Sequence, residues 1–172
     1  KKKHNPIDVF IGSKNREEYS EIVFQDIEST KPYQYNLFRG FPFSPIKKVD
    51  TFLFWNFVKE VICNSDEFMY AVTYSWMAQI IQQPFTKIGT ALVLTGEKGC
   101  GKSTFVKIFG DLFGDYFMQT ASLKRMFGDF NAHLQSNLLF YANESIWSGD
   151  KANEGKLKNF ITETEFTYEI KG

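Results

Sequence analysis

The residues best suited to chemistry form a glycine-rich stretch from Gly96 to Ser103, which reads G-E-K-G-C-G-K-S and matches the pattern G-x-x-x-x-G-K-[ST] in full. Glycines in such a loop adopt dihedrals closed to other residues and bring backbone N–H groups close to phosphate oxygens. A helix that follows the loop adds partial positive charge. At average residue frequencies, the pattern is expected only about 0.006 times in a chain of this length. It therefore predicts a nucleoside-triphosphate site.

Each loop position has a predicted role. Lys102 is expected to reach the β and γ phosphates as a catalytic residue, and the Ser103 hydroxyl is expected to bind Mg²⁺. The predicted ligands are therefore ATP and Mg²⁺. Cys100 occupies a variable position, and catalysis does not need a thiol there. The alternative is a loop that keeps this shape without a ligand. The full predicted nucleotide-binding set is Gly96, Glu97, Lys98, Gly99, Cys100, Gly101, Lys102, Ser103 and Thr104.

A second motif supplies the carboxylate that hydrolysis requires. The apolar run Asn137–Ala142 predicts a buried strand, and Asn143 and Glu144 follow it, as in a Walker B element at the carboxyl edge of a sheet. Glu144 is the candidate general base and a candidate metal-site residue. Asn143 is expected to contact the metal through a water, but an amide carries no charge, so metal affinity is expected to be weaker. The alternative for Glu144 is a residue that begins a helix.

Charge and composition limit the remaining function classes. The chain has 172 residues, with 20 Lys or Arg balanced by 20 Asp or Glu. A polycationic nucleic-acid coat is excluded, and any DNA contact must be local. With 43% hydrophobic residues and 19 Phe, the composition is that of a folded domain with an aromatic core. Lys156, Lys158 and Lys171 are candidate DNA-binding residues, or simply solvated side chains.

Targeting and redox signals are weak. Cys63 and Cys100 are the only cysteines, so a disulfide framework or zinc site is not expected. The opening residues lack an apolar signal region, which makes a cytoplasmic location the expectation. The longest uncharged stretch, 68–86, is close to membrane-span length but contains several polar residues. It predicts a buried soluble helix and no membrane partner.

The elements that would position these motifs alternate between strand and helix. Gly89–Thr95 predicts a central strand buried on both faces, because it is apolar, rich in β-formers and bounded by glycines. This alternation indicates an α/β layered sheet. The other predicted elements are helices over 104–112, 121–127 and 151–162, a weak strand over 116–119, and strands over 137–142 and 165–171.

Residues 1–86 predict an irregular segment followed by helices. Residues 1–50 mix charges, prolines and aromatics without sustained periodicity, which indicates an irregular segment. Asp50 is a candidate cap for a buried helix over 51–63, and Asn64 with Glu67 resembles a capping box for a helix that ends before Pro84. The expected organisation is an irregular aromatic-rich segment (1–50), a helical collar-like segment (51–86) and a partial P-loop ATPase core (87–172).

Taken together, these residues resemble the superfamily 3 helicases, and more closely the primase-helicase ATPase domain of phages, plasmids and large DNA viruses such as poxviruses. Four stretches carry the resemblance: 35–41, 76–84 running on to 89–94, the P-loop, and 157–162 running on to 171–172. The resemblance implies an AAA+-like three-layer αβα sandwich with a parallel sheet. It also implies a ring, usually a hexamer, that translocates on single-stranded or forked DNA during replication. By position, Lys171 matches a basic loop that faces the ring channel.

The chain also departs from that family. After Gly172 the family continues into a strand that ends in a polar sensor and, later, an arginine that reaches the neighbouring subunit's nucleotide. Arg16, Arg39 and Arg125 are the only arginines here, and none lies where that finger is expected. An arginine finger contributes about 10³ to 10⁵ in rate. The expectation is therefore a partial core that binds nucleotide weakly and hydrolyses it slowly.

Three functions follow from these patterns. The leading one is an ATP-hydrolysing core of a DNA helicase or primase-helicase, working in a bacterial host cytoplasm or at a viral replication site. The second is a non-catalytic DNA-binding or assembly module that nucleotide stabilises, since Asn143 replaces the usual acid. The third is a nucleotide or small-molecule kinase, which is disfavoured because the chain has too few arginines after the P-loop to form a lid.

Overall fold

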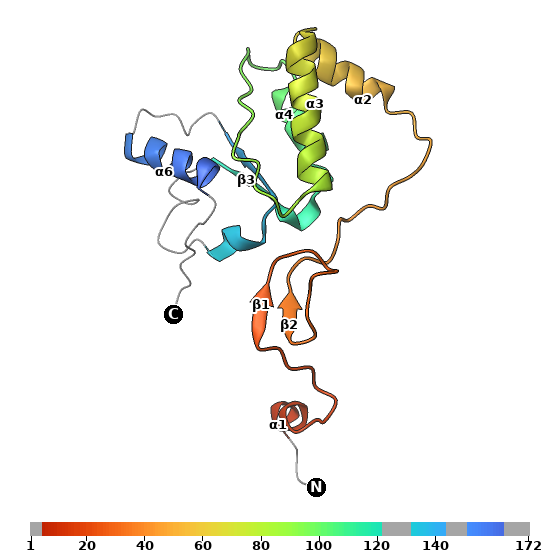
Figure 1. Cartoon of the computed structure of the whole chain (residues 1–172), viewed down its shortest axis with the longest axis vertical. Coiled ribbons are helices and arrows are strands. Elements are labelled where there is room, and N and C mark those ends of the chain that lie inside the picture. The colour runs from red at the N-terminus through yellow and green to blue at the C-terminus, as the bar shows by residue number, and fades with distance from the viewer. Residues whose placement is uncertain (1–4, 122–131, 144–150, 164–172) are drawn as a thin grey trace. The chain divides into compact units, whose positions relative to one another are not determined.

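The computed structural model describes residues 5–121, 132–143 and 151–163 (Figure 1). The fold is mixed α/β, with helices and two small parallel sheets. Contacts divide the chain into two compact units, Lys1–Arg39 and Gly40–Gly172. The candidate nucleotide loop belongs to the second unit.

The first unit contains three short elements within the segment expected to be irregular. They are α1 (Pro6–Ile11), β1 (Glu21–Val23) and β2 (Gln34–Asn36), and the two strands pair in parallel. Helix α1 begins where Asn5 Oδ1 accepts a hydrogen bond from the Ile7 N–H at 3.1 Å. These elements could not be predicted from the sequence, because each is too short to show a periodicity.

One buried amide organises this unit. The side chain of Asn36 is 6% exposed, and its Nδ2 donates to the carbonyl of Gln25 at 2.8 Å and to Thr30 Oγ1 at 2.7 Å. Its Oδ1 accepts from the N–H groups of Phe38 at 3.0 Å and of Gln25 at 3.3 Å. Asn36 therefore satisfies its buried polar atoms and ties β2 to the turn that precedes it.

The second unit begins with helices. Helix α2 (Phe52–Phe57) continues directly into a π-helical turn, η1 (Val58–Ile62), and α3 (Glu67–Gln82) lies beside them (Figure 1). The predicted helix over 51–63 is thus confirmed in extent, although its second half is π-helical.

The predicted helix caps are displaced by one or two residues. Thr51 is the N-cap of α2, although Asp50 Oδ1 still accepts from the Phe52 N–H at 2.9 Å. Asp66, and not Asn64, caps α3, because its carboxylate accepts from the Met69 N–H. Asn64 instead adopts a left-handed backbone, with φ of 50°.

The helices are less buried than their sequences indicate. Phe52 is 66% exposed and Leu53 is 83% exposed, so the expectation of a helix buried around its circumference is wrong. Helix α3 buries one face only, because the described part of the chain covers it from one side. The core of this unit consists of Val58, Cys63, Met77, Ile80, Phe105, Phe109, Phe113 and Leu139.

The helix after the glycine-rich loop packs on a small sheet. Helix α4 (Lys102–Asp111) precedes a short 3₁₀ turn and β3 (Phe117–Thr120), which pairs in parallel with β4 (Leu139–Ala142). A Cβ at Gly110 would lie 2.4 Å from Cε1 of Phe117, so only glycine allows α4 to approach β3 this closely. The predictions for this helix and these strands are confirmed within two residues.

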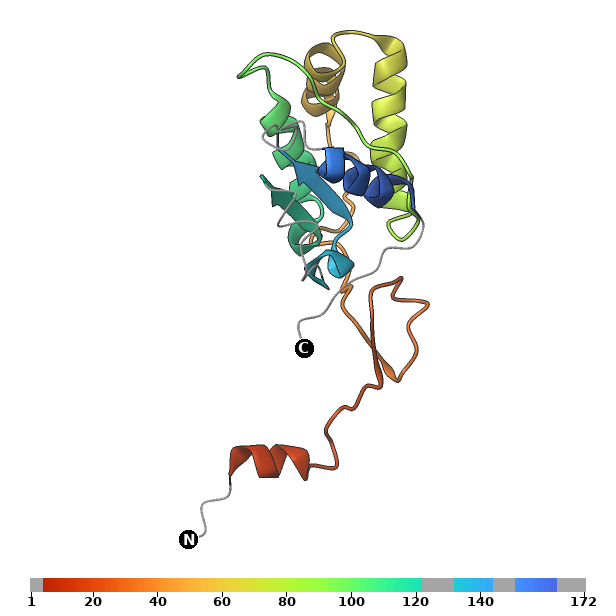
Figure 2. The same ribbon diagram turned by 90° about the vertical axis from the view of Figure 1, so that its left-hand side faces the viewer.

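Helix α6 (Lys151–Thr162) matches its predicted range and packs beside β4 (Figure 2). The Phe160 ring meets Phe140 of β4 edge to face, with centroids 5.0 Å apart. Leu157 and Phe160 also pack against Leu134, which lies in the 3₁₀ helix Ala132–Ser136. The predicted helix over 121–127 lies almost wholly outside the described residues, and the predicted strand over 165–171 lies entirely outside them.

The predicted central strand is the main correction. The segment 89–95 belongs to neither of the sheets, which pair β1 with β2 and β3 with β4, and Val93 is 70% exposed. An extended segment becomes a strand only when a neighbour completes its ladder of hydrogen bonds. Among the described residues, none pairs with 89–95 in that way. Within that same part of the chain, no helix has the length and apolar character needed to cross a membrane.

Candidate functional site

The glycine-rich loop has the backbone conformation that its sequence predicts. Gly96, Gly99 and Gly101 have φ values of 139°, 88° and 96°, in the region that side-chain-bearing residues rarely adopt. Gly101 is the N-cap of α4, and its carbonyl accepts from the Phe105 N–H at 2.9 Å. The three glycines therefore turn the chain sharply into the helix.

The side chain of Lys102 connects the end of the loop to its beginning. Its Nζ donates to the carbonyl oxygens of Gly96 at 2.7 Å and Glu97 at 2.9 Å, and it lies 3.5 Å from Cys100 Sγ. The ammonium thus closes the loop on itself by binding the carbonyls of its first two residues. A lysine has three donors and one compact charge, so the same group can serve phosphate oxygens on that side of the loop.

The N-terminus of α4 provides further donors. The first N–H groups of a helix have no intrahelical acceptor, and the helix dipole favours an anion beside them. Ser103 and Thr104 are exposed in this first turn. Phe105 and Phe109 are 3% and 2% exposed and anchor the other side of α4 in the core. The helix is therefore fixed to the core on one side, while Ser103 and Thr104 of its first turn are exposed.

The side chains that pack against the end of the loop could not be predicted from the sequence. A Cβ at Gly101 would lie 2.9 Å from Cε2 of Phe57 and 3.6 Å from Cγ1 of Val61. The residues before the P-loop were expected to form core packing, and no local sequence signal shows which of their side chains meets the loop. The contact depends on tertiary structure alone.

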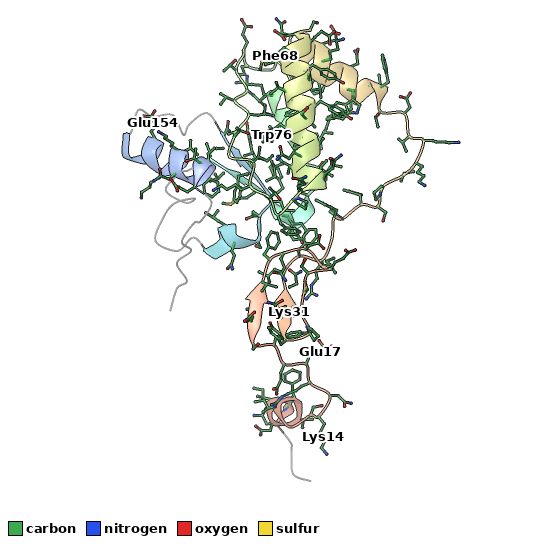
Figure 3. The ribbon with its side chains drawn as sticks, in the orientation of Figure 1. Lys14, Glu17, Lys31, Phe68, Trp76 and Glu154 are labelled. Carbon is green, nitrogen blue, oxygen red and sulfur yellow. The ribbon has the colours of Figure 1, made fainter. Side chains whose placement is uncertain are left out.

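Helix α3 holds the segment that leads into the loop. Trp76 projects from the middle of α3 (Figure 3), and its Nε1–H donates to the carbonyl of Thr90 at 3.4 Å. Its ring also contacts Phe109 of α4, with centroids 6.1 Å apart. Trp76 therefore connects α3 both to residues 89–95, the segment that leads into the loop, and to α4, the helix that follows the loop.

The second predicted motif is described only in part. Asn143 follows β4 with an exposed side chain, and its N–H donates to the carbonyl of Thr120 at 3.0 Å, which extends the parallel pairing beyond β4. Glu144 and Lys171 lie outside the described residues. Lys156 and Lys158 are exposed on α6. The structure thus brings the P-loop residues together, and it places Asn143 at the carboxyl end of a parallel strand as expected.

The described residues contain no group of three His, Cys, Asp or Glu side chains that could hold a metal ion. Mg²⁺ in phosphate sites usually binds one or two protein groups and completes its shell with phosphate oxygens and water. The exposed hydroxyl of Ser103, directly after Lys102, is chemically suited to such a site. Both cysteines are free thiols; Cys63 is buried and Cys100 is half-buried.

Comparison with known proteins gives one similarity. Residues 94–172 match the model of a family described as "Family of unknown function (DUF5906)". The matched range includes the P-loop, α4, β3, β4 and α6. Neither the curated proteins nor the solved structures include a match to the chain.

Proposed function

We propose that the chain is a nucleotide-binding ATPase core that binds Mg²⁺–ATP at the loop 96–103. The observation that carries this proposal is the loop itself. Three of its glycines have positive φ, the Lys102 ammonium binds the carbonyls of Gly96 and Glu97, and a helix with one side in the core follows directly. This arrangement supplies backbone donors, a point charge and a helix N-terminus on one side of a turn. Polyphosphates are the ligands that such a combination recognises.

Each residue of the site has a separate role in this proposal. The loop N–H groups and the Lys102 ammonium bind the phosphates, with Lys102 exchanging its carbonyl partners for phosphate oxygens. Ser103 is the protein ligand of Mg²⁺, which would supply charge neutralisation at the transferred phosphate. Glu144 would accept a proton from the attacking water, and Asn143 would orient a metal-bound water.

The finer fold and the biological role belong to the same proposal. Parallel pairing of β3 with β4, followed by Asn143 and Glu144, supports a P-loop sandwich of the AAA+ type. The resemblance to superfamily 3 helicases suggests a replication helicase or primase-helicase that forms a ring and translocates on DNA. Lys156, Lys158 and Lys171 are the proposed DNA contacts.

Nucleotide binding is tested with a fluorescent ADP analogue in the presence of Mg²⁺. Charge-assisted hydrogen bonds contribute about 1.5 to 3 kcal/mol, so Lys102→Ala is expected to weaken binding by about 10- to 100-fold. Lys107→Ala is the matched control, because Lys107 is an exposed lysine on the same helix. The proposal fails if the wild-type chain binds no nucleotide, or if both variants lose affinity equally.

A second function, a non-catalytic assembly module stabilised by nucleotide, is favoured by one observation. Asn143 provides no charge at the strand end where the usual motif places an acid. DNA-stimulated ATP hydrolysis separates the two functions. The ATPase predicts turnover that Glu144→Gln abolishes while nucleotide still binds, whereas the assembly module predicts nucleotide binding without turnover in either protein.

A further inference from the structure

The last residue of α2 places an aromatic side chain against the glycine-rich loop. Phe57 is the last residue of α2, and a Cβ at Gly101 would lie 2.9 Å from its Cε2 and 3.1 Å from its Cζ. The Phe57 ring is therefore in van der Waals contact with the Gly101 backbone. Gly101 has no side chain that could pack against the core. The Phe57 ring packs against its backbone instead.

The backbone around Phe57 is well anchored. In η1 the Cys63 N–H donates to the Val58 carbonyl at 2.9 Å, a π-type bond that widens the turn by one residue. Val58 is fully buried, at 0% exposure, and Cys63 is 7% exposed. Both belong to the same core as Phe105 and Phe109 of α4. The turn that directly follows Phe57 and the helix that follows Gly101 are thus fixed to one core.

Two restraints then act on the loop from opposite ends. Lys102 binds the carbonyls at its beginning, and Phe57 contacts its last glycine, where the left-handed conformation begins α4. The first restraint weakens when Lys102 exchanges a carbonyl partner for a phosphate oxygen, as the function proposed above requires. The second can persist in both states, because it is a packing contact that uses no hydrogen bond or charge of the loop.

We propose that Phe57 is a positioning residue of the P-loop, which holds Gly101 and the loop before it in the phosphate-binding conformation. Its consequence for nucleotide affinity rests on the function proposed above, but its effect on the loop does not. Phe57 supports the loop through packing and contributes no charge or hydrogen bond.

The two cysteines allow a direct test within one molecule. Cys100 lies in the loop and is half-buried, with its Sγ 3.0 Å from the position of a Cβ at Gly96, whereas Cys63 is buried in the core. The rates at which iodoacetamide alkylates the two thiols are measured by mass spectrometry, without nucleotide. Phe57→Ala is expected to raise the Cys100 rate about threefold or more, with the Cys63 rate unchanged, because only the loop loosens.

Phe54→Ala is the matched control. Phe54 lies one turn earlier on α2, belongs to the same half-buried aromatic set and contacts Trp55, with centroids 5.1 Å apart. Its variant is expected to leave the Cys100 rate at the wild-type value, and Phe57→Leu is expected to restore most of the protection. The inference is overturned if Cys100 reacts at the same rate in Phe57→Ala, if Cys63 accelerates equally, or if Phe54→Ala has the same effect on Cys100.

Nucleotide binding supplies a separate readout. If the wild-type chain binds Mg²⁺–ADP, Phe57→Ala is expected to weaken binding about fivefold, and Phe54→Ala less than twofold. Unchanged affinity in Phe57→Ala would overturn the positioning role. If the wild-type chain binds no nucleotide, the proposed function fails, and the thiol rates still decide whether Phe57 holds the loop.

Discussion

The close approach of α4 to β3 makes a strong prediction for Gly110→Ala. In an ordinary helix this change gains about 0.5 to 1 kcal/mol, because alanine loses less conformational freedom than glycine. At Gly110 the new Cβ would lie 2.4, 2.6 and 2.8 Å from three ring carbons of Phe117, closer than such atoms approach. Overpacking of this kind costs about 1 to 3 kcal/mol. After the helix-propensity gain is subtracted, the net destabilisation is at most about 2.5 kcal/mol, and three contacts below 3.0 Å place the expected value at about 1 to 2 kcal/mol.

Gly155→Ala is the matched control for this prediction. Gly155 lies in α6, and a Cβ there would meet no atom within 4 Å. It should show the helix-propensity gain alone. The difference between the two variants therefore isolates the cost of contact with Phe117, about 1 to 3 kcal/mol.

Equilibrium urea unfolding measures both variants, with the slope of the transition checked for a change in the denatured state. The reasoning is refuted if Gly110→Ala is as stable as the wild type, or if it gains as much as Gly155→Ala. A further Phe117→Leu change should recover part of the loss in Gly110→Ala, since a smaller side chain leaves room for the methyl group.

Two further predictions concern the buried amide of Asn36 and the partly desolvated ammonium of Lys87. Asn36→Ala should make residues 5–39 markedly more sensitive to limited proteolysis, because it removes the side-chain acceptor of the buried Phe38 N–H and of the half-buried Gln25 N–H. Loss of the acceptor of a buried donor costs about 1 to 3 kcal/mol. Asn15 is exposed, so Asn15→Ala should not increase cleavage, and equal cleavage of the two variants would contradict the prediction. Burial lowers the pKa of Lys87, whose Nζ donates to the Glu163 carbonyl. The unfolded chain therefore binds the Lys87 proton more tightly than the folded chain does. As a result, the free energy of unfolding should rise with pH just below the usual lysine pKa of 10.5. Lys87→Met should lack this rise in urea unfolding, and a wild-type-minus-variant difference that stays constant with pH would count against it.

Local patterns predicted much of this structure. The loop at 96–103, α4 and α6 follow from glycine placement and helical periodicity, and α3 ends at Gln82, close to Pro84 as expected. The strand at 89–95 is among the predictions that failed, although its composition is right for a strand. Composition cannot supply the neighbouring strand, and the described sheets do not pair with this segment.

Tertiary contacts were equally beyond the sequence. The contact of Phe57 with Gly101 depends on how the end of α2 lies against the glycine-rich loop. The hydrogen bond from Trp76 to Thr90 depends on how α3 lies beside the segment that leads into that loop. The structural role of Asn36 could not be predicted, because it comes from burial and not from residue type.

Parallel strand pairing has a consequence for how the chain folds. Neither β1 with β2 nor β3 with β4 can form as a hairpin, because the chain must first return through residues 24–33 or 121–138 to the starting end of the first strand. Each pairing therefore waits for a loop to close, whereas α3 and α4 form from contacts between near neighbours. We expect the helices to order early in refolding and the two sheets to set the overall rate.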